Sequence, residues 1–202
     1  LDKSVVRLLS HAPCIAKIDA IGVAGVRCVV AENVGVNYTQ SLAMARHINL
    51  GNYYHAMLLG SKIHRKIQRQ MGSNYSAEVS LKQEVEWEGI TLIIEGRADG
   101  IFEEDGIWID EIKGVYREVS RLESPVKVHL AQAKCYAYIY AKKEELEQIG
   151  VQMAYCQMET EEIKRFREVY SFDELKVWFD NQVQKTARLK AAPAPPTKRR
   201  AQ

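Results

Sequence analysis

The spacing of hydrophobic residues predicts helices and strands from about residue 55 onward. Leu59, Ile63 and Ile67 recur at every fourth position, which indicates the apolar face of a helix over residues 55–71. Apolar and polar side chains then alternate over residues 77–87, and this period of two is typical of a strand. The regular part of the chain therefore opens with a helix followed by a strand.

A hairpin comes next, and it carries charges inside apolar runs. Glu104-Asp105-Gly106 has the composition of a three-residue loop between two isoleucine-rich segments. With such a loop Glu103 pairs with Ile107, and Asp99 lies directly opposite Glu111 with the two Cβ atoms about 5 Å apart. A two-residue loop would shift the register and place the two carboxylates on opposite faces.

These charges are typical of a metal site. The isoleucines around them predict strands buried on both faces, where Asp, Glu and Lys are rarely found without a role. Asp99 and Glu111 repel each other across the ladder unless a divalent cation lies between them, and carboxylates are ligands that magnesium prefers. Lys113 shares the face of Glu111, because side chains alternate along a strand. A surface hairpin with solvated charges is the alternative.

The downstream pattern predicts a helix, two strands and a last helix. Ser124-Pro125 has the composition of an N-cap followed by proline, so we expect a helix to start there. Two apolar runs, over residues 151–158 and 166–170, predict strands. Ser171-Phe172-Asp173-Glu174 then has the sequence of a capping box that opens the last helix.

Four short patterns occur together in an order that resembles a known nuclease family. They are Gly60-Ser61-Lys62-Ile63-His64, Gly96-Arg97-Ala98-Asp99, Glu111-Ile112-Lys113 and Gln132-Ala133-Lys134-Cys135-Tyr136. They resemble the Gly-x-x-x-His, Gly-Arg-x-Asp, (Asp/Glu)-x-Lys and Gln-x-x-x-Tyr motifs of the PD-(D/E)xK nucleases, in particular the RecB-like exonuclease branch. That branch includes nucleases of CRISPR spacer acquisition and nuclease domains attached to helicases. The resemblance covers about residues 55–190.

The resemblance implies an α/β (α+β) fold with a restriction-endonuclease-like αβββαβ core, a central mixed sheet flanked by helices. The nuclease core would span residues 55–190. Residues 1–54 would form an N-terminal cap or insertion, whose structure the pattern does not define. Residues 191–202 would form a basic, Pro-rich tail or linker, because six Lys or Arg and no acidic residue follow Asp180.

The resemblance also implies a set of site residues. The implied catalytic residues are Asp99, Glu111, Lys113, Gln132 and Tyr136. The implied ligands of Mg²⁺ or Mn²⁺ are His64, Asp99, Glu111 and the backbone carbonyl of Ile112. The implied substrate contacts are Arg97, Gln132 and Tyr136. On the residues alone, a single histidine beside an apolar helix stripe is more often structural than a ligand.

The function that follows is a divalent-metal-dependent deoxyribonuclease, an exonuclease that hydrolyses DNA phosphodiester bonds in repair, recombination or CRISPR-type processing. Two alternatives stay open: the nuclease domain of a helicase–nuclease, and a non-catalytic nucleic-acid-binding module of the same fold. The chain has no Gly-rich phosphate loop ending in Gly-Lys-Ser/Thr, so we expect no nucleotide-driven motor within it. The expected partners are DNA, as single strands or duplex ends, and a helicase domain or subunit.

Composition adds the expected setting. The four cysteines, Cys14, Cys28, Cys135 and Cys156, lack metal-ligand spacing, so we expect reduced, buried thiols in a cytoplasmic protein. Some members of the family carry an iron–sulfur cluster; we expect none here, because no cysteine follows Cys156 to supply trailing ligands. No apolar run approaches the roughly 18 residues that span a bilayer, so we expect no membrane partner.

Overall fold

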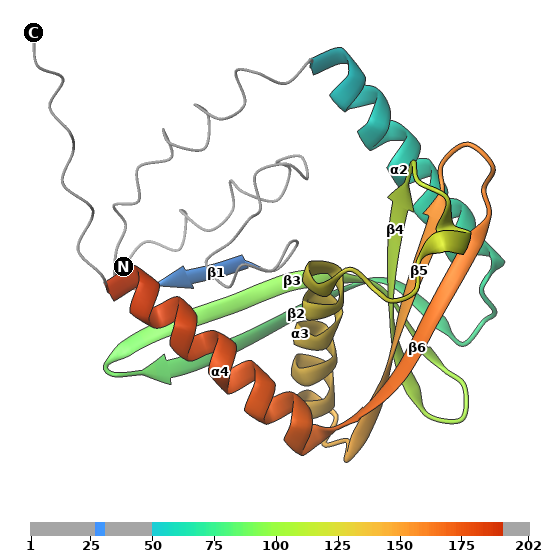
Figure 1. The fold of residues 1–202 in the computed structure, drawn as a ribbon. Coiled ribbons are helices and arrows are strands. Elements are labelled where there is room, and N and C mark those ends of the chain that lie inside the picture. Colours follow the sequence, from blue (N-terminus) through green and yellow to red (C-terminus); the bar gives the residue numbers. More distant parts are fainter. Residues whose placement is uncertain (1–26, 31–49, 192–202) are drawn as a thin grey trace, which may run out of the picture.

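The computed structural model describes residues 27–30 and 50–191, which form a mixed sheet flanked by helices (Figure 1). In chain order the elements are β1 (Arg27–Val30), α2 (Leu50–Gln70), β2 (Tyr75–Trp87), β3 (Ile90–Glu103), β4 (Ile107–Val115), η3 (Val119–Arg121), α3 (Lys127–Lys143), β5 (Gln148–Gln157), β6 (Ile163–Ser171) and α4 (Phe172–Ala191). The α/β class, with a helix, three strands, a helix and a strand around a mixed sheet, is confirmed. Most of the predicted cap and nearly all of the predicted tail lie outside the described residues.

The hairpin between β3 and β4 has the predicted register. Asp105 and Gly106 both have positive φ, at 49° and 128°, which turns the chain within three residues. Glu103 therefore pairs with Ile107, and the ladder continues to Gly100 opposite Asp110. Asp99 and Glu111 are the next positions on the two strands, as the three-residue loop predicts.

Strand β3 changes its neighbour part-way along its length. Residues 100–103 pair with β4, whereas residues 92–95 pair with β1, and β2 follows the other edge of β3. The two arms of the hairpin thus separate beyond the pair Gly100–Asp110. We call this point the fork. On its other edge β4 pairs with β5, in the only parallel ladder among the described strands.

Helices cover β4 from both sides, so that its centre is buried on both faces as predicted. Ile109 belongs to the larger core, where α3 and α4 pack against the sheet (Figure 1). Ile112 points to the opposite face and packs against Ile63 and Ile67 of α2. Between them, Asp110 and Glu111 are 0% and 1% exposed. This strand therefore holds two acidic side chains in the interior.

The two helices that carry candidate site residues begin at other positions than the sequence predicts. Helix α2 begins at Leu50, five residues before the predicted start. Helix α3 begins at Lys127 rather than directly after Ser124, because the backbone N–H of Val126 donates a hydrogen bond to the hydroxyl of Tyr155 (2.9 Å) and holds Val126 extended. That contact comes from β5, and local composition could not reveal it.

Two smaller predictions are confirmed in the described part of the chain. The capping box closes the start of α4: the Ser171 N–H donates to Glu174 Oε2 (2.9 Å), and the Glu174 N–H donates to Ser171 Oγ (3.3 Å). Cys135 and Cys156 are buried, and neither forms a disulfide bond with another described residue. Cys14 and the side chain of Cys28 lie outside the described part. Among the described helices, none is long and apolar enough to cross a membrane.

Candidate active site

The fork leaves a backbone donor of β4 without a strand partner, and Asp99 satisfies it. The Ile112 N–H donates a hydrogen bond to Asp99 Oδ2 (2.7 Å), while His64 Nδ1 lies 3.2 Å from Asp99 Oδ1. Burial raises the pKa of Asp99, but its hydrogen bond to His64, the charges of His64 and Lys113, and the Ile112 N–H outweigh burial and lower the pKa. Asp99 is therefore held as a carboxylate.

His64 reaches this carboxylate because of how α2 packs. Ile63 and Ile67 contact Ile112 on the face of the sheet that α2 covers, and His64 is the neighbour of Ile63. A Cβ added at Gly60 would meet Met158 Cε at 3.8 Å, an ordinary van der Waals contact. Among the described residues, close approach of another segment therefore does not explain the glycine in the Gly-x-x-x-His pattern.

Glu111 is the second acid at the fork, and its hydrogen bonding is incomplete. Lys113 Nζ donates to Glu111 Oε1 (2.5 Å), whereas Glu111 Oε2 is buried without a hydrogen-bond partner among the described residues. Burial, followed by the charge of Asp99, raises the pKa of Glu111 to about 8 against the opposing effect of Lys113. A buried acceptor without a donor is costly, so this oxygen is suited to bind a cation.

Lys113 connects the hairpin to α3. Its ammonium group donates a second hydrogen bond to Gln132 Oε1 (3.0 Å), and Gln132 Nε2 donates to the hydroxyl of Tyr136 (3.3 Å). Gln132 and Tyr136 lie one turn apart on the same face of the helix. Apart from Arg97, the predicted residues from His64 to Tyr136 thus form a continuous series of contacts, although they come from three separate parts of the chain.

Arg97 is the predicted site residue that the structure does not bring to the fork. Its side chain is exposed, and Arg97 Nε lies 2.6 Å from Glu78 Oε2 on β2. Arg97 contributes to the site through its backbone alone. Burial raises the pKa of Tyr136, and a hydrogen bond with the Arg97 backbone opposes this effect. The predicted contact between the Arg97 side chain and DNA stays a prediction.

The residues at the fork fit a divalent cation that takes few protein ligands. No group of three or more His, Cys, Asp and Glu side chains in the described chain is arranged to hold a metal. Mg²⁺ nevertheless often binds through one or two carboxylates, with water and substrate phosphate as its other ligands. Asp99 and the unpartnered Oε2 of Glu111 supply that pair. The Ile112 carbonyl points to the same side of β4 as the Ile112 N–H, and hence toward Asp99.

Two further sets of contacts were not predicted from the sequence. Asp110, on the opposite face of β4, accepts hydrogen bonds from Tyr75 and Gln152. His129, one turn before Gln132, contacts Tyr155 of β5. Strand alternation directs Asp110 away from Glu111, but the sequence could not reveal partners that come from β2 and β5.

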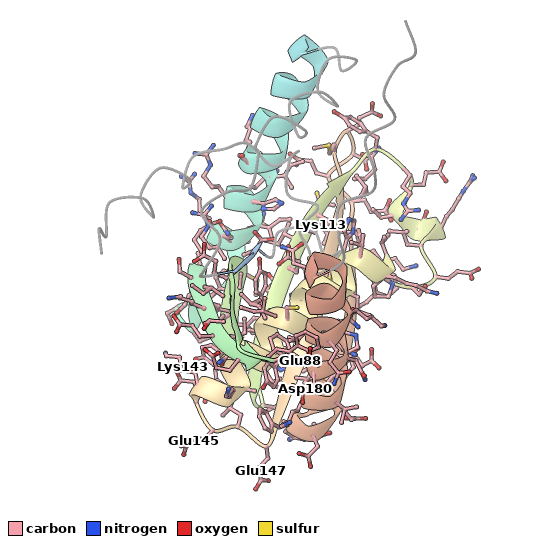
Figure 2. All side chains as sticks on the ribbon, turned by 90° about the vertical axis from the view of Figure 1, so that its left-hand side faces the viewer. Glu88, Lys113, Lys143, Glu145, Glu147 and Asp180 are labelled. Atoms are coloured by element: carbon pink, nitrogen blue, oxygen red, sulfur yellow. The ribbon has the colours of Figure 1, made fainter. Side chains whose placement is uncertain are left out.

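A large cavity lies far from the fork. Its volume is about 560 Å³, and its lining includes Glu145, Glu147 and Ser171. Figure 2 shows Glu145 and Glu147 at the bottom of the view, well below Lys113. This cavity is therefore separate from the candidate active site, which is formed by the contacts at the fork.

Comparisons with known proteins bear on the fold alone. No family model and no curated protein matches the chain. The chain is similar to a solved structure, the crystal structure of SSO0001, with a TM-score of 0.51 and 19% sequence identity over 78% of this chain and 72% of that one. At this identity the likeness supports the α/β fold. Membership of the PD-(D/E)xK nucleases stays a prediction from the four sequence patterns.

Proposed function

We propose that this chain is a divalent-metal-dependent deoxyribonuclease of the PD-(D/E)xK type, acting as an exonuclease on DNA. The observation that carries the proposal is the buried Oε2 of Glu111, which has no hydrogen-bond partner among the described residues and lies close enough to Asp99 for the charge of Asp99 to raise the Glu111 pKa. A bound cation would explain why two acids lie together in the interior and why one of them has an oxygen without a hydrogen-bond donor.

The protein's own groups have distinct roles in this proposal. Asp99 and Glu111 would hold the cation, with His64 and the Ile112 carbonyl beside them. When bound, Mg²⁺ or Mn²⁺ supplies an acidified water and neutralises charge on the phosphate. His64 keeps Asp99 oriented and ionised, since its hydrogen bond and charge lower the Asp99 pKa.

Lys113 and the α3 residues would act on the substrate. In the free protein Lys113 divides its hydrogen bonds between Glu111 and Gln132, so its ammonium group is already fixed beside the acids. There it would orient the attacking water and stabilise negative charge on a phosphate oxygen. Gln132 and Tyr136 fix the lysine from the helix side and would position the scissile phosphate.

The test is a matched pair of substitutions at neighbouring buried acids. Glu111→Gln keeps the size of the side chain but removes the charge that would bind the cation. We expect it to reduce Mn²⁺-dependent degradation of end-labelled DNA by at least about a hundred-fold. Asp110→Asn changes the adjacent acid on the opposite face, and it should keep the rate within a few-fold of wild type.

The assay uses linear and circular DNA, single- and double-stranded, with and without Mn²⁺. Degradation of linear but not circular DNA is expected for an exonuclease. Wild-type cleavage by Glu111→Gln would sink the proposal, provided that both variants melt cooperatively. Metal-independent DNA binding without any degradation by the wild type would instead favour a non-catalytic binding module.

A further inference from the structure

Helix α3 presents one more polar side chain along the face that carries Gln132 and Tyr136. His129 precedes Gln132 by three residues, so the three side chains share that face. Its ring lies against Tyr155, with ring centroids 5.8 Å apart and Nδ1 3.2 Å from the hydroxyl. Tyr155 is the residue of β5 that pairs with Lys113 of β4. His129 is therefore next to the candidate active site.

The hydrogen bonds around Tyr155 determine which nitrogen of His129 carries the proton. The Val126 N–H donates to the Tyr155 oxygen (2.9 Å), which leaves the hydroxyl proton of this buried side chain in need of an acceptor. Among the described residues that acceptor is His129 Nδ1. Nε2 of the neutral ring is then the protonated nitrogen and a donor, and no described residue accepts a hydrogen bond from it.

The surroundings of His129 are positively charged. Burial, Lys113 and Arg117 lower the pKa of His129 to about 4, so the ring is neutral at pH 7. The charge of Arg117 also acts on the Tyr155 hydroxyl, which places its guanidinium near the same point. Arg117 is exposed, and it forms no ion pair with any described residue. A fixed N–H donor beside an unpaired guanidinium and an ammonium group is suited to bind an anion.

We propose that His129 Nε2–H and Arg117 form a second phosphate subsite, which binds the DNA backbone phosphate next to the one held at Lys113. This inference rests on the proposed function, because it takes DNA as the substrate. His129 contributes a donor without charge, and Arg117 contributes a charge. Replacing Arg117 should therefore change the salt dependence of DNA binding, whereas replacing His129 should leave it unchanged.

The experiment measures binding of a fluorescent single-stranded oligonucleotide in EDTA, by anisotropy over a range of salt concentrations. His129→Asn retains an acceptor for Tyr155 but loses the Nε2 donor, and we expect about ten-fold weaker binding with an unchanged salt slope. Arg117→Gln should weaken binding and reduce the slope of log K against log salt by roughly 0.7–1. The control is Arg121→Gln, because Arg121 already pairs with Glu118 at 2.5 Å.

A methylphosphonate linkage moved along the oligonucleotide locates the contact. One neutral linkage should weaken wild-type binding and have little further effect on His129→Asn or Arg117→Gln, as expected for groups that interact directly. Wild-type affinity and salt slope in both variants, with unchanged melting temperatures, would overturn the subsite. If the subsite variants behave as expected but the wild type cleaves no DNA with Mn²⁺, the subsite stands and the nuclease proposal fails.

Discussion

Two neighbouring acids on β4, Asp110 and Glu111, are equally buried and differ in what surrounds them. Asp110 Oδ2 accepts a hydrogen bond from the Tyr75 hydroxyl (3.0 Å), and Oδ1 accepts one from Gln152 Nε2 (2.8 Å). Glu111 has one partner, Lys113, and its second oxygen has none in the described chain. Burial raises the pKa of both acids. Hydrogen bonding, rather than burial, therefore separates a structural acid from one that is available to a ligand.

The Asp110 face is built to complete these bonds. Gly100 has no side chain, and a Cβ there would lie 1.9 Å from the ring of Tyr75, so only glycine allows Tyr75 to cross the strand to Asp110. Gln152 is held in turn by Arg167, whose Nε donates to Gln152 Oε1 (2.6 Å). Tyr75, Asp110 and Gln152 therefore all have described partners. The Glu111 face instead keeps one acceptor open at the fork.

Removing Asp110 should have the largest effect on stability. Asp110→Ala leaves the Tyr75 hydroxyl and the Gln152 amide as buried donors without an acceptor, so we expect the free energy of unfolding to fall by roughly 2–4 kcal/mol. Urea denaturation measures it. Glu111→Gln, measured alongside, should cost less than about 1 kcal/mol because glutamine keeps an oxygen that can accept the hydrogen bond of Lys113. Equal losses in the two variants would contradict the contrast between the faces.

The stability of the metal-free protein should also depend on pH through Glu111. Its pKa is about 8 in the folded protein against 4.5 for an ordinary glutamate, so between these values the folded state binds the proton more tightly. Stability should therefore fall as pH rises from about 5 to 8, by an amount on the order of 2 kcal/mol. Asp99, whose pKa is lowered in the folded protein, affects stability over a different pH range. Its contribution to stability is lost only as pH falls below about 4.

Mn²⁺ provides the control for this dependence. The cation favours the ionised form of Glu111, so its stabilising effect should grow between pH 5 and 8. Thermal melting with and without Mn²⁺ across this range measures both effects. Without Mn²⁺, Glu111→Gln should remove the part of the pH dependence of melting that arises from this acid. A wild-type profile that Glu111→Gln leaves unaltered would assign the dependence to another group.

A smaller loss is expected from Gly100→Ala. The new methyl group forces the Tyr75 ring away from Gly100, which breaks its hydrogen bond to Asp110 and its stacking on Phe102. We expect a destabilisation of about 1–3 kcal/mol, measured by urea denaturation. Tyr75→Phe removes only the hydroxyl and should cost less. An unchanged stability of Gly100→Ala would show that the ring has room to move without loss.

The smallest effect is expected far from both faces of β4. Ser171→Ala removes the side chain that accepts the Glu174 N–H at the start of α4. Loss of an N-cap of this kind costs about 0.5–2 kcal/mol. The nuclease rate below the melting transition should not change, which separates general destabilisation from loss of the site. A large drop in cleavage with an intact fold would place α4 in the mechanism.

The hairpin was predictable because its determinants are local. The turn residues and the alternation of side chains fixed the pairing of Glu103 with Ile107 and so the positions of Asp99 and Glu111. The predicted contact of Arg97 with DNA stays a prediction, and the pairing of its side chain with Glu78 of β2 is a contact that motif spacing does not contain. His64 and Gln132 had been identified only by resemblance to a family, and α2 and α3 bring them to the hairpin.

The sequence by itself therefore determined the main helices and strands from about residue 55 onward, the register of the hairpin and the set of acids with their lysine. These follow from backbone preferences and from the two-residue period of a strand. Only the tertiary structure decided that β3 leaves β4 for β1, which opens the fork at Asp99, and that Asp110 finds two donors while Glu111 keeps an open oxygen. These features depend on pairings between segments tens of residues apart. Such pairings arise from packing of the whole domain, which no local pattern encodes.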